Sequence, residues 1–253
     1  MIIDSHCHID FPEFDDDREQ VLERAFNVGV RRIIVPGVMQ QTWPGIQHCC
    51  DKYQHLYPCY GLHPYFIDRH TEQHLTDLEY WLQTKQPIAV GECGLDFFLK
   101  ELDRNRQHYF FEQQLDLAVK FKLPVVIHAR KSTEEVIRAI KQRPSLRGMI
   151  HSYSGSYEQA IQLIDLNFYL SFGGPATYPN SKRLRKMILQ LPLECILVET
   201  DAPDQPVANA ENRRNEPACI SHVIDSIAEL HQVDREEVIM TTAENAQQLF
   251  QLI

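Results

Sequence analysis

Histidine and carboxylate side chains occur in this sequence where they can bind a metal ion together. His6 and His8 are separated by one residue, so on an extended segment their imidazoles point to the same side and can chelate one ion. Further residues of these types lie far along the chain, namely Glu92, His128, His151 and Asp201. Imidazole and carboxylate ligands without thiolates suit Zn²⁺, Mn²⁺, Ni²⁺ or Fe²⁺, and Mg²⁺ if carboxylates and water dominate.

Taken singly, each of these residues has an ordinary explanation, such as a surface histidine, a buried ion pair or a helix cap. As a set, four histidines and two carboxylates exceed what one tetrahedral ion needs, whereas two ions that share a carboxylate would use them all. Two ions about 3.5–4 Å apart lower the pKa of a bridging water and stabilise charge on an attacked phosphorus or carbonyl. The set therefore predicts a hydrolase that activates water with two divalent ions.

Short apolar runs alternate with longer amphipathic stretches, and this pattern predicts the elements that would bring these residues together. Most runs lack polar alternation, which is typical of parallel strands buried on both faces. We expect strands at residues 2–4, 32–35, 57–61, 88–91, 125–127, 149–150, 168–172 and 196–199. Helical stripes follow at residues 104–122 and after Glu216, and a last helix begins near Asp234.

Eight strand–helix rounds predict a TIM (β/α)₈ barrel that forms one domain over residues 1–253. No Gly-rich nucleotide-binding loop follows any strand, which removes the usual reason to expect an open sheet. The histidines and carboxylates, together with His63 and Arg130, each follow an apolar run. Since active sites of this barrel lie where the C-terminal ends of the strands converge, we expect these residues to meet in one pocket.

Composition and charge narrow the kind of protein further. The chain is 43% hydrophobic, and no apolar stretch approaches the roughly 20 residues that span a bilayer. The formal charge of −10 argues against a general nucleic-acid coat protein but not against a phosphate substrate. The seven cysteines form no Cys-x-x-Cys pair and are expected to be reduced thiols. Without a signal-peptide pattern, we expect a cytoplasmic protein that contacts no membrane.

Seven ordered motifs resemble those of the TatD-like metal-dependent hydrolases, a family of the amidohydrolase superfamily, over essentially the whole chain. They are Asp4-Ser-His6-Cys-His8, Gly61-Leu-His63-Pro, Val90-Gly-Glu92-Cys-Gly-Leu-Asp96, Pro124-Val-Val-Ile-His128-Ala-Arg130, His151-Ser-Tyr-Ser-Gly155, Glu199-Thr-Asp201-Ala-Pro and Arg214-Asn-Glu-Pro217. Segments 173–179 and 201–206 look most like the YjjV branch. Cys93 stands where the family usually has an aliphatic residue, and Ser152-Tyr153 replaces the more common Cys-Phe.

The resemblance implies two bound divalent ions, whose identity among Zn²⁺, Mg²⁺, Mn²⁺ and Ni²⁺ stays open. Glu92 would bridge the ions. The remaining ligands would be His6, His8 and Asp201 for the first ion and His128 and His151 for the second. Glu92 and Asp201 would be the catalytic carboxylates, with Asp201 as general base.

The same resemblance implies a substrate. The family includes deoxyribonucleases and 3′–5′ exonucleases, so the expected activity is that of a deoxyribonuclease or phosphodiesterase acting on DNA, with RNA as an alternative. His63 and Arg130 would contact the substrate phosphate, a task for which the arginine fork is suited. We expect a monomer without a stable protein partner.

Two other functions stay open. One is hydrolysis of another ester, an amide or a lactone on the same scaffold. Many members of the wider superfamily carry a carboxylated lysine at the end of the fourth strand, and Glu92 at this place favours the TatD family. The other is a metal-containing binding module without turnover, against which the intact ligand set and the presence of His63 and Arg130 argue.

Weaker signals surround the expected site. A basic cluster begins the helix after the seventh strand, and a second lies after the eighth; they comprise Lys182, Arg183, Arg185 and Lys186, and Arg213 and Arg214. The first cluster can guide a polynucleotide backbone or can be a solvated helix face, and the second can hold a phosphate at the mouth. Tyr65 and Phe66 can stack on a base or pack at the barrel rim.

Overall fold

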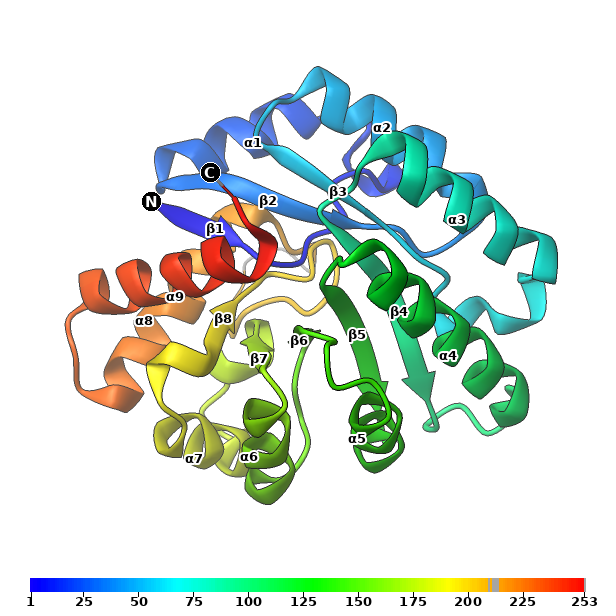
Figure 1. Ribbon diagram of the computed structural model, residues 1–253. Coiled ribbons are helices and arrows are strands. Elements are labelled where there is room, and N and C mark those ends of the chain that lie inside the picture. Colours follow the sequence, from blue (N-terminus) through cyan, green and yellow to red (C-terminus); the bar gives the residue numbers. More distant parts are fainter. Residues whose placement is uncertain (209, 211–213, 253) are drawn as a thin grey trace.

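The computed structural model of the protein describes residues 1–208, 210 and 214–252. Its eight strands pair in parallel in the order β1 to β8, so each strand lies beside its neighbour in the sequence. Helices follow the strands and surround them on the outside (Figure 1). The predicted single-domain TIM barrel is confirmed, because buried parallel strands joined by right-handed helical crossovers close on themselves in this way.

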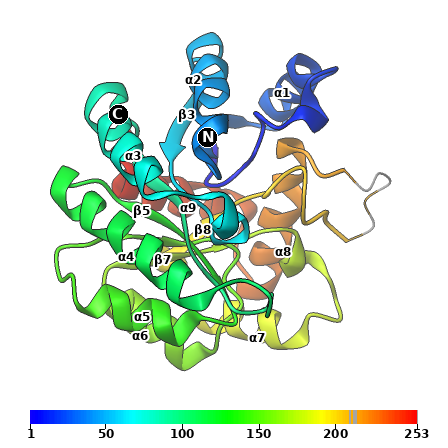
Figure 2. The ribbon, with the colours of Figure 1, turned by 90° about the vertical axis from the view of Figure 1, so that its right-hand side faces the viewer.

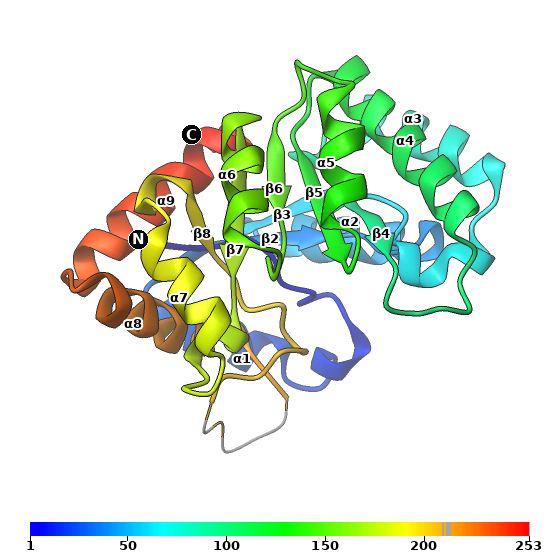
Figure 3. The same ribbon diagram turned by 90° about the horizontal axis from the view of Figure 1, so that it is seen from below.

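The strands are short and the helices amphipathic. The strands are β1 (Ile2–Asp4), β2 (Val30–Pro36), β3 (Leu56–Tyr60), β4 (Ala89–Asp96), β5 (Val125–Arg130), β6 (Gly148–Ile150), β7 (Phe168–Phe172) and β8 (Ile196–Val198). The α-helices are α1 (Arg18–Asn27), α2 (Trp43–Lys52), α3 (Glu72–Lys85), α4 (Arg104–Phe121), α5 (Thr133–Lys141), α6 (Tyr157–Asp165), α7 (Lys182–Gln190), α8 (Ile220–His231) and α9 (Arg235–Phe250). Helices α5 to α8 follow one another around the outside of the barrel (Figure 3).

Backbone hydrogen bonds join the first and last strands and complete the ring. Ser5 N donates to Val198 O over 3.0 Å. Just beyond the strand ends, His8 N donates to Ala202 O over 2.8 Å, and Asp201 N donates to His6 O over 2.9 Å. The two segments that carry His6, His8 and Asp201 are therefore fixed to each other through their backbones.

Apolar side chains fill one end of the barrel, which we call the floor. Seven strands each contribute one buried residue, and α9 covers them; the cluster comprises Ile3, Ile34, Cys59, Ala89, Val126, Met149 and Leu197, with Ala243, Ala246, Leu249 and Phe250 of α9. Full burial of a Leu or Phe side chain contributes roughly 1.5–3 kcal/mol. The last helix, whose start near Asp234 is confirmed, thus closes the barrel at the end opposite the expected site.

The lengths of two strands differ from the expectation. Residues 88–91 and 125–127 were the expected extents of the fourth and fifth strands, but β4 continues to Asp96 and β5 to Arg130. Glu92, His128 and Arg130 therefore lie within strands rather than after them. Polar residues interrupt the apolar pattern here, while the parallel ladder between β4 and β5 continues through them.

The other expected elements agree with the structure to within a few residues. The 3-10 helix that precedes α8 (Pro217–Cys219) packs against α1 (Figure 2). Within the described ranges, no helix combines the length and apolar character that crossing a membrane requires.

Candidate metal centre

The interior of the barrel changes from apolar to polar within two residues of the floor. Residues two apart on a strand share a face, so the residues that follow the floor by two positions also point into the barrel. Such pairs are Val126 and His128, Met149 and His151, and Leu197 and Glu199. The strand period therefore places imidazole and carboxylate groups at the C-terminal end of the barrel, which we call the mouth.

Glu92 reaches the interior through an irregularity in β4. Since Ala89 belongs to the floor, regular alternation would point Gly91 and Cys93 inward and Glu92 outward. The pairing of β4 with β5 shifts between Val90 and Cys93, and Gly91 has a φ of +155°, a conformation that a side chain would strain. The shift directs Glu92 into the barrel, where its side chain is only 3% exposed.

A first group of potential metal ligands at the mouth consists of four side chains: His6, His8, Glu92 and Asp201. The Nε2 atoms of His6 and His8 lie 3.3 Å apart. Glu92 Oε2 lies 3.2 and 3.6 Å from these nitrogens, and Asp201 Oδ1 lies 3.5 and 3.6 Å from them. Ligand atoms about 2.1 Å from a tetrahedral ion stand about 3.4 Å apart, so this group fits an ion of the size of Zn²⁺.

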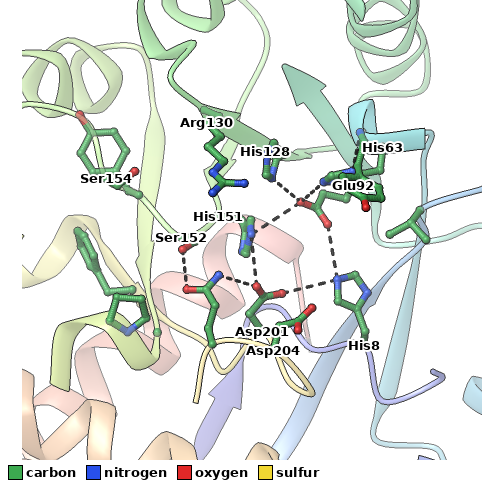
Figure 4. A pocket seen from close by; sticks show the side chains of 18 of the residues that line it. His8, His63, Glu92, His128, Arg130, His151, Ser152, Ser154, Asp201 and Asp204 are labelled. Atoms are coloured by element: carbon green, nitrogen blue, oxygen red, sulfur yellow. Dashed lines mark hydrogen bonds and ion pairs between the residues drawn. The ribbon is translucent and has the colours of Figure 1, made fainter. Parts of the chain in front are cut away.

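The second oxygen of Glu92 faces a different set of histidines (Figure 4). Glu92 Oε1 lies 3.1 Å from His63 Nε2, 3.3 Å from His128 Nδ1 and 3.8 Å from His151 Nε2. His151 Nε2 also lies 3.9 Å from Asp201 Oδ2. The structure thus brings the six predicted ligands together, and Glu92 lies between two groups of potential metal ligands.

Two further carboxylates determine which nitrogen of His128 and of His151 is free to bind an ion. His128 Nε2 lies 3.1 Å from Asp96 Oδ2, and His151 Nδ1 lies 3.0 Å from Glu199 Oε1. An imidazole nitrogen beside an ionised carboxylate carries the proton, so the other nitrogen presents a lone pair. In both rings that other nitrogen faces Glu92.

His63 has the opposite arrangement. Its Nδ1 accepts a hydrogen bond of 3.0 Å from Tyr65 N, and burial lowers the pKa of its imidazole. A neutral imidazole whose Nδ1 is an acceptor carries its proton on Nε2. His63 therefore presents an N–H donor at the mouth rather than a lone pair, which separates it chemically from the six ligand candidates.

The electrostatics of the cluster favour a bound cation. Burial works to lower the pKa of His151, but the carboxylates of Glu199, Asp201 and Glu92 outweigh it and raise the pKa to about 10. Burial raises the pKa of Asp201 to about 6, although His151 and His6 oppose this rise. The same negative surroundings that would place a proton on His151 attract a divalent ion in its place.

The pKa shifts of Glu92 and His8 also favour a bound cation. Burial opposes ionisation of Glu92, yet the histidines around it, led by His63 and His6, hold its pKa well below the usual range. Burial, with His6 nearby, lowers the pKa of His8 to about 3. Glu92 is thus a carboxylate and His8 a neutral imidazole, which are the protonation states that metal ligands require.

A cleft of about 680 Å³ opens above the cluster, a volume usual for small-molecule and cofactor sites. Arg130 lies at its edge, with half of its side chain exposed and its guanidinium 3.8 Å from the centre of the Phe98 ring. Tyr65 and Phe66 also line the cleft, and their rings pack edge to face. Asp204 adds a carboxylate to this lining.

Three residues of the basic clusters are engaged with the protein itself. Both carboxylate oxygens of Asp17 bind Arg214, at 2.8 and 2.6 Å, while Arg213 lies outside the described residues. Arg185 is turned inward and donates to a backbone carbonyl and to a serine hydroxyl. Arg183 donates to a carbonyl at the rim of the cleft. These contacts engage two of the four basic residues of α7, while Lys182 and Lys186 are exposed.

Three residues of the site, Asp96, Glu199 and Gln205, were given no role in the sequence analysis. Asp96 and Glu199 stand in the motifs that contain Glu92 and Asp201, and their acidic character near a strand end was the available signal. Gln205 donates to Asp201 Oδ2 over 2.5 Å. An amide residue in a loop gives no comparable signal.

Known proteins resemble this chain in sequence and in fold. The family model described as TatD related DNase matches residues 3–251. Escherichia coli K12 YjjV, described as an uncharacterized metal-dependent hydrolase, is 35% identical over 251 residues, which are 98% of this chain and 97% of YjjV. Bacillus subtilis 168 YabD, described in the same words, is 34% identical over 254 residues, and the alignment covers both chains completely.

The crystal structure of E. coli YjjV, a TatD homolog, matches this one with a TM-score of 0.96 at 34% identity, over 100% of this chain and 98% of that chain. A hydrolase of the TatD family from Entamoeba histolytica shares the fold with a TM-score of 0.89 at 20% identity, over 98% and 97% of the two chains. The resemblance seen in the sequence motifs is confirmed. The chain belongs to the TatD family of metal-dependent hydrolases.

Proposed function

We propose that the protein is a phosphodiesterase that cleaves DNA with a water activated by two divalent ions. The observation that carries this proposal is the divergence of the two oxygens of Glu92. Oε2 faces His6 and His8, whereas Oε1 faces His128 and His151. A carboxylate with other potential metal ligands near each of its oxygens is suited to bridging two ions.

The proposed ligands follow from this geometry. His6, His8 and Asp201 would hold the first ion, His128 and His151 the second, with Glu92 shared. When bound, the ions lower the pKa of a water molecule and offset negative charge on the attacked group. Asp96 and Glu199 keep the protons of His128 and His151 on the nitrogens that face away from Glu92.

The chain's own residues complete the chemistry. Asp201, at the edge of both groups of potential metal ligands, would accept the proton of the attacking water. The N–H of His63 would donate a hydrogen bond to a phosphate oxygen, because Tyr65 N fixes its tautomer. Arg130 would bind the same phosphate from the edge of the cleft, with Phe98 supporting its guanidinium plane.

DNA is the proposed substrate because the matching family is described as TatD related DNases and because Arg130 and His63 offer donors to a phosphate. The test is a cleavage assay on single- and double-stranded DNA with protein reconstituted in Mg²⁺, Mn²⁺ or Zn²⁺. The Glu92→Ala protein, purified in parallel, measures contaminating nuclease. We expect cleavage only by the wild-type protein.

A second candidate function is hydrolysis of a small ester, amide or lactone. The cleft volume of about 680 Å³ and the carboxylate of Asp204 in its lining favour a compact substrate over an extended polyanion. The same reconstituted protein should therefore be assayed on a panel of lactones, amides and small phosphoesters. Turnover on this panel with no cleavage of DNA under any metal would replace the first proposal with the second.

A further inference from the structure

Residues from three loops at the mouth meet beside Asp201. They are Ser152, the segment 173–179, and residues 202–206 next to Asp201 in the chain. Ser152 follows β6, the first segment follows β7, and the second follows β8. They come from three successive strand ends at the mouth, and their contacts show that they form one unit.

Gln205 is the centre of this unit. Its Nε2 donates to Asp201 Oδ2 over 2.5 Å, and its Oε1 accepts from Ser152 Oγ over 2.9 Å (Figure 4). The backbone N of Ser152 donates to Glu199 Oε1 over 2.8 Å, the same oxygen that lies 3.0 Å from His151 Nδ1. A continuous set of polar contacts therefore links Asp201 to His151 through Gln205, Ser152 and Glu199.

The backbone of Gln205 is held in place by the neighbouring segments. Asn215, whose side chain is buried, donates from Nδ2 to the carbonyls of Asp204 and Gln205 over 2.9 and 3.1 Å. At Gly174 an added Cβ would lie 2.0 Å from Gln205 O, so this close approach requires a glycine. Tyr178 Oη donates to Pro206 O over 3.0 Å. The loop between β7 and α7 thus packs against Gln205 and Pro206 and holds the backbone of Gln205 in place.

We propose that Gln205 is a positioning residue for Asp201. Ser152 orients the side chain of Gln205, and the loop that begins at Gly173 packs against its backbone. Gln205 holds Oδ2 of Asp201 by a hydrogen bond, which fixes Oδ1 on His6 Nε2 and His8 Nε2 at 3.5 and 3.6 Å. A neutral amide suits this task, because it satisfies a buried carboxylate oxygen without cancelling the charge that a cation needs. This inference rests on the metal ligands of the proposed function.

The test compares the zinc affinity of the wild type with that of Gln205→Leu, Ser152→Ala and the double variant, by competition with a chromophoric chelator. We expect Gln205→Leu to lower the zinc affinity of the site that includes Asp201 about 10–100-fold. Losses of this size follow when other hydrogen-bond partners of metal ligands are removed. Ser152→Ala should have a smaller effect, and it should add nothing in the Gln205→Leu background, because Ser152 acts through Gln205. The visible spectrum of the cobalt(II)-loaded protein should change in the same order.

Gln248→Leu is the matched control, since Gln248 accepts a hydrogen bond from Tyr169 Oη away from the mouth. The melting temperature of each variant in chelator separates loss of folding from loss of positioning. Equal zinc affinities and identical cobalt spectra in wild type and Gln205→Leu would overturn the positioning role and leave the metal centre standing. A wild-type protein that takes up no zinc would overturn both proposals, so the two failures are distinguishable.

Discussion

The floor and the mouth of the barrel are built on the same strands, two residues apart, and they have opposite chemistry. On β6, Met149 is buried in an apolar cluster closed by α9, and His151 follows it among carboxylates. The floor stabilises the fold by removing apolar surface from water. The mouth costs free energy, because ionisable groups are largely buried there. The comparison teaches that the strands are stabilised at one end so that the other end can hold charged groups close together.

The largest expected effect is at the mouth. Glu92→Ala should reduce turnover by far more than the roughly 100-fold that loss of an outer partner of a ligand costs, because it removes a potential metal ligand from both groups. The protein should stay folded, since the floor is untouched. Circular dichroism and hydrolysis of the best substrate measure the two quantities. Activity near that of the wild type would show that the mouth does not work through Glu92.

Met149→Ala probes the floor on β6, two residues before His151. Loss of this buried side chain should lower the free energy of unfolding by about 2–5 kcal/mol, measured by urea denaturation in chelator. Zinc affinity of the folded protein should stay within about twofold of the wild type. A large loss of affinity with little loss of stability would contradict the separation of floor and mouth.

Asp96→Ala sharpens the comparison within the mouth. Without the carboxylate beside Nε2, His128 can place its proton on the nitrogen that faces Glu92, so metal affinity should fall about 10–100-fold. Asp77→Ala, which removes a partly exposed helix carboxylate bound to Gln73, is the control. If both variants bind zinc like the wild type, Asp96 does not orient His128.

The smallest effect is expected at the edge of the cleft. Arg130→Ala should raise KM for DNA about tenfold, the value of one hydrogen bond to a charged group, and should leave KM for an uncharged ester nearly unchanged. Steady-state kinetics on both substrates give the answer. Equal increases for the two substrates would remove the phosphate-binding role of Arg130.

Much of this architecture could be predicted from the sequence, since strand period and topology determine it. The eight apolar runs predict the barrel, and the barrel brings His6, Glu92, His128 and Asp201 together from distant positions. The inward direction of Glu92, which we expected from its place in the motif, does not follow from strand alternation, because it depends on a shift in the pairing of β4 with β5. Regular alternation from Ala89 would have turned it outward.

Contacts between loops were equally beyond the sequence. The hydrogen bond from Gln205 to Asp201 depends on how the segments after β7 and β8 pack, and no periodicity describes that packing. Likewise, the tautomer of His63 depends on one backbone N–H of Tyr65. Such details follow from three-dimensional proximity alone.

The central proposal is that Glu92 would bridge two divalent ions at the mouth. The most direct measurement is anomalous diffraction above and below the zinc absorption edge from crystals of the zinc-reconstituted protein. The account predicts two peaks on opposite sides of the Glu92 carboxylate, one beside His6 and His8 and one beside His128 and His151. A single peak, or two peaks that leave Glu92 in contact with only one ion, would contradict it.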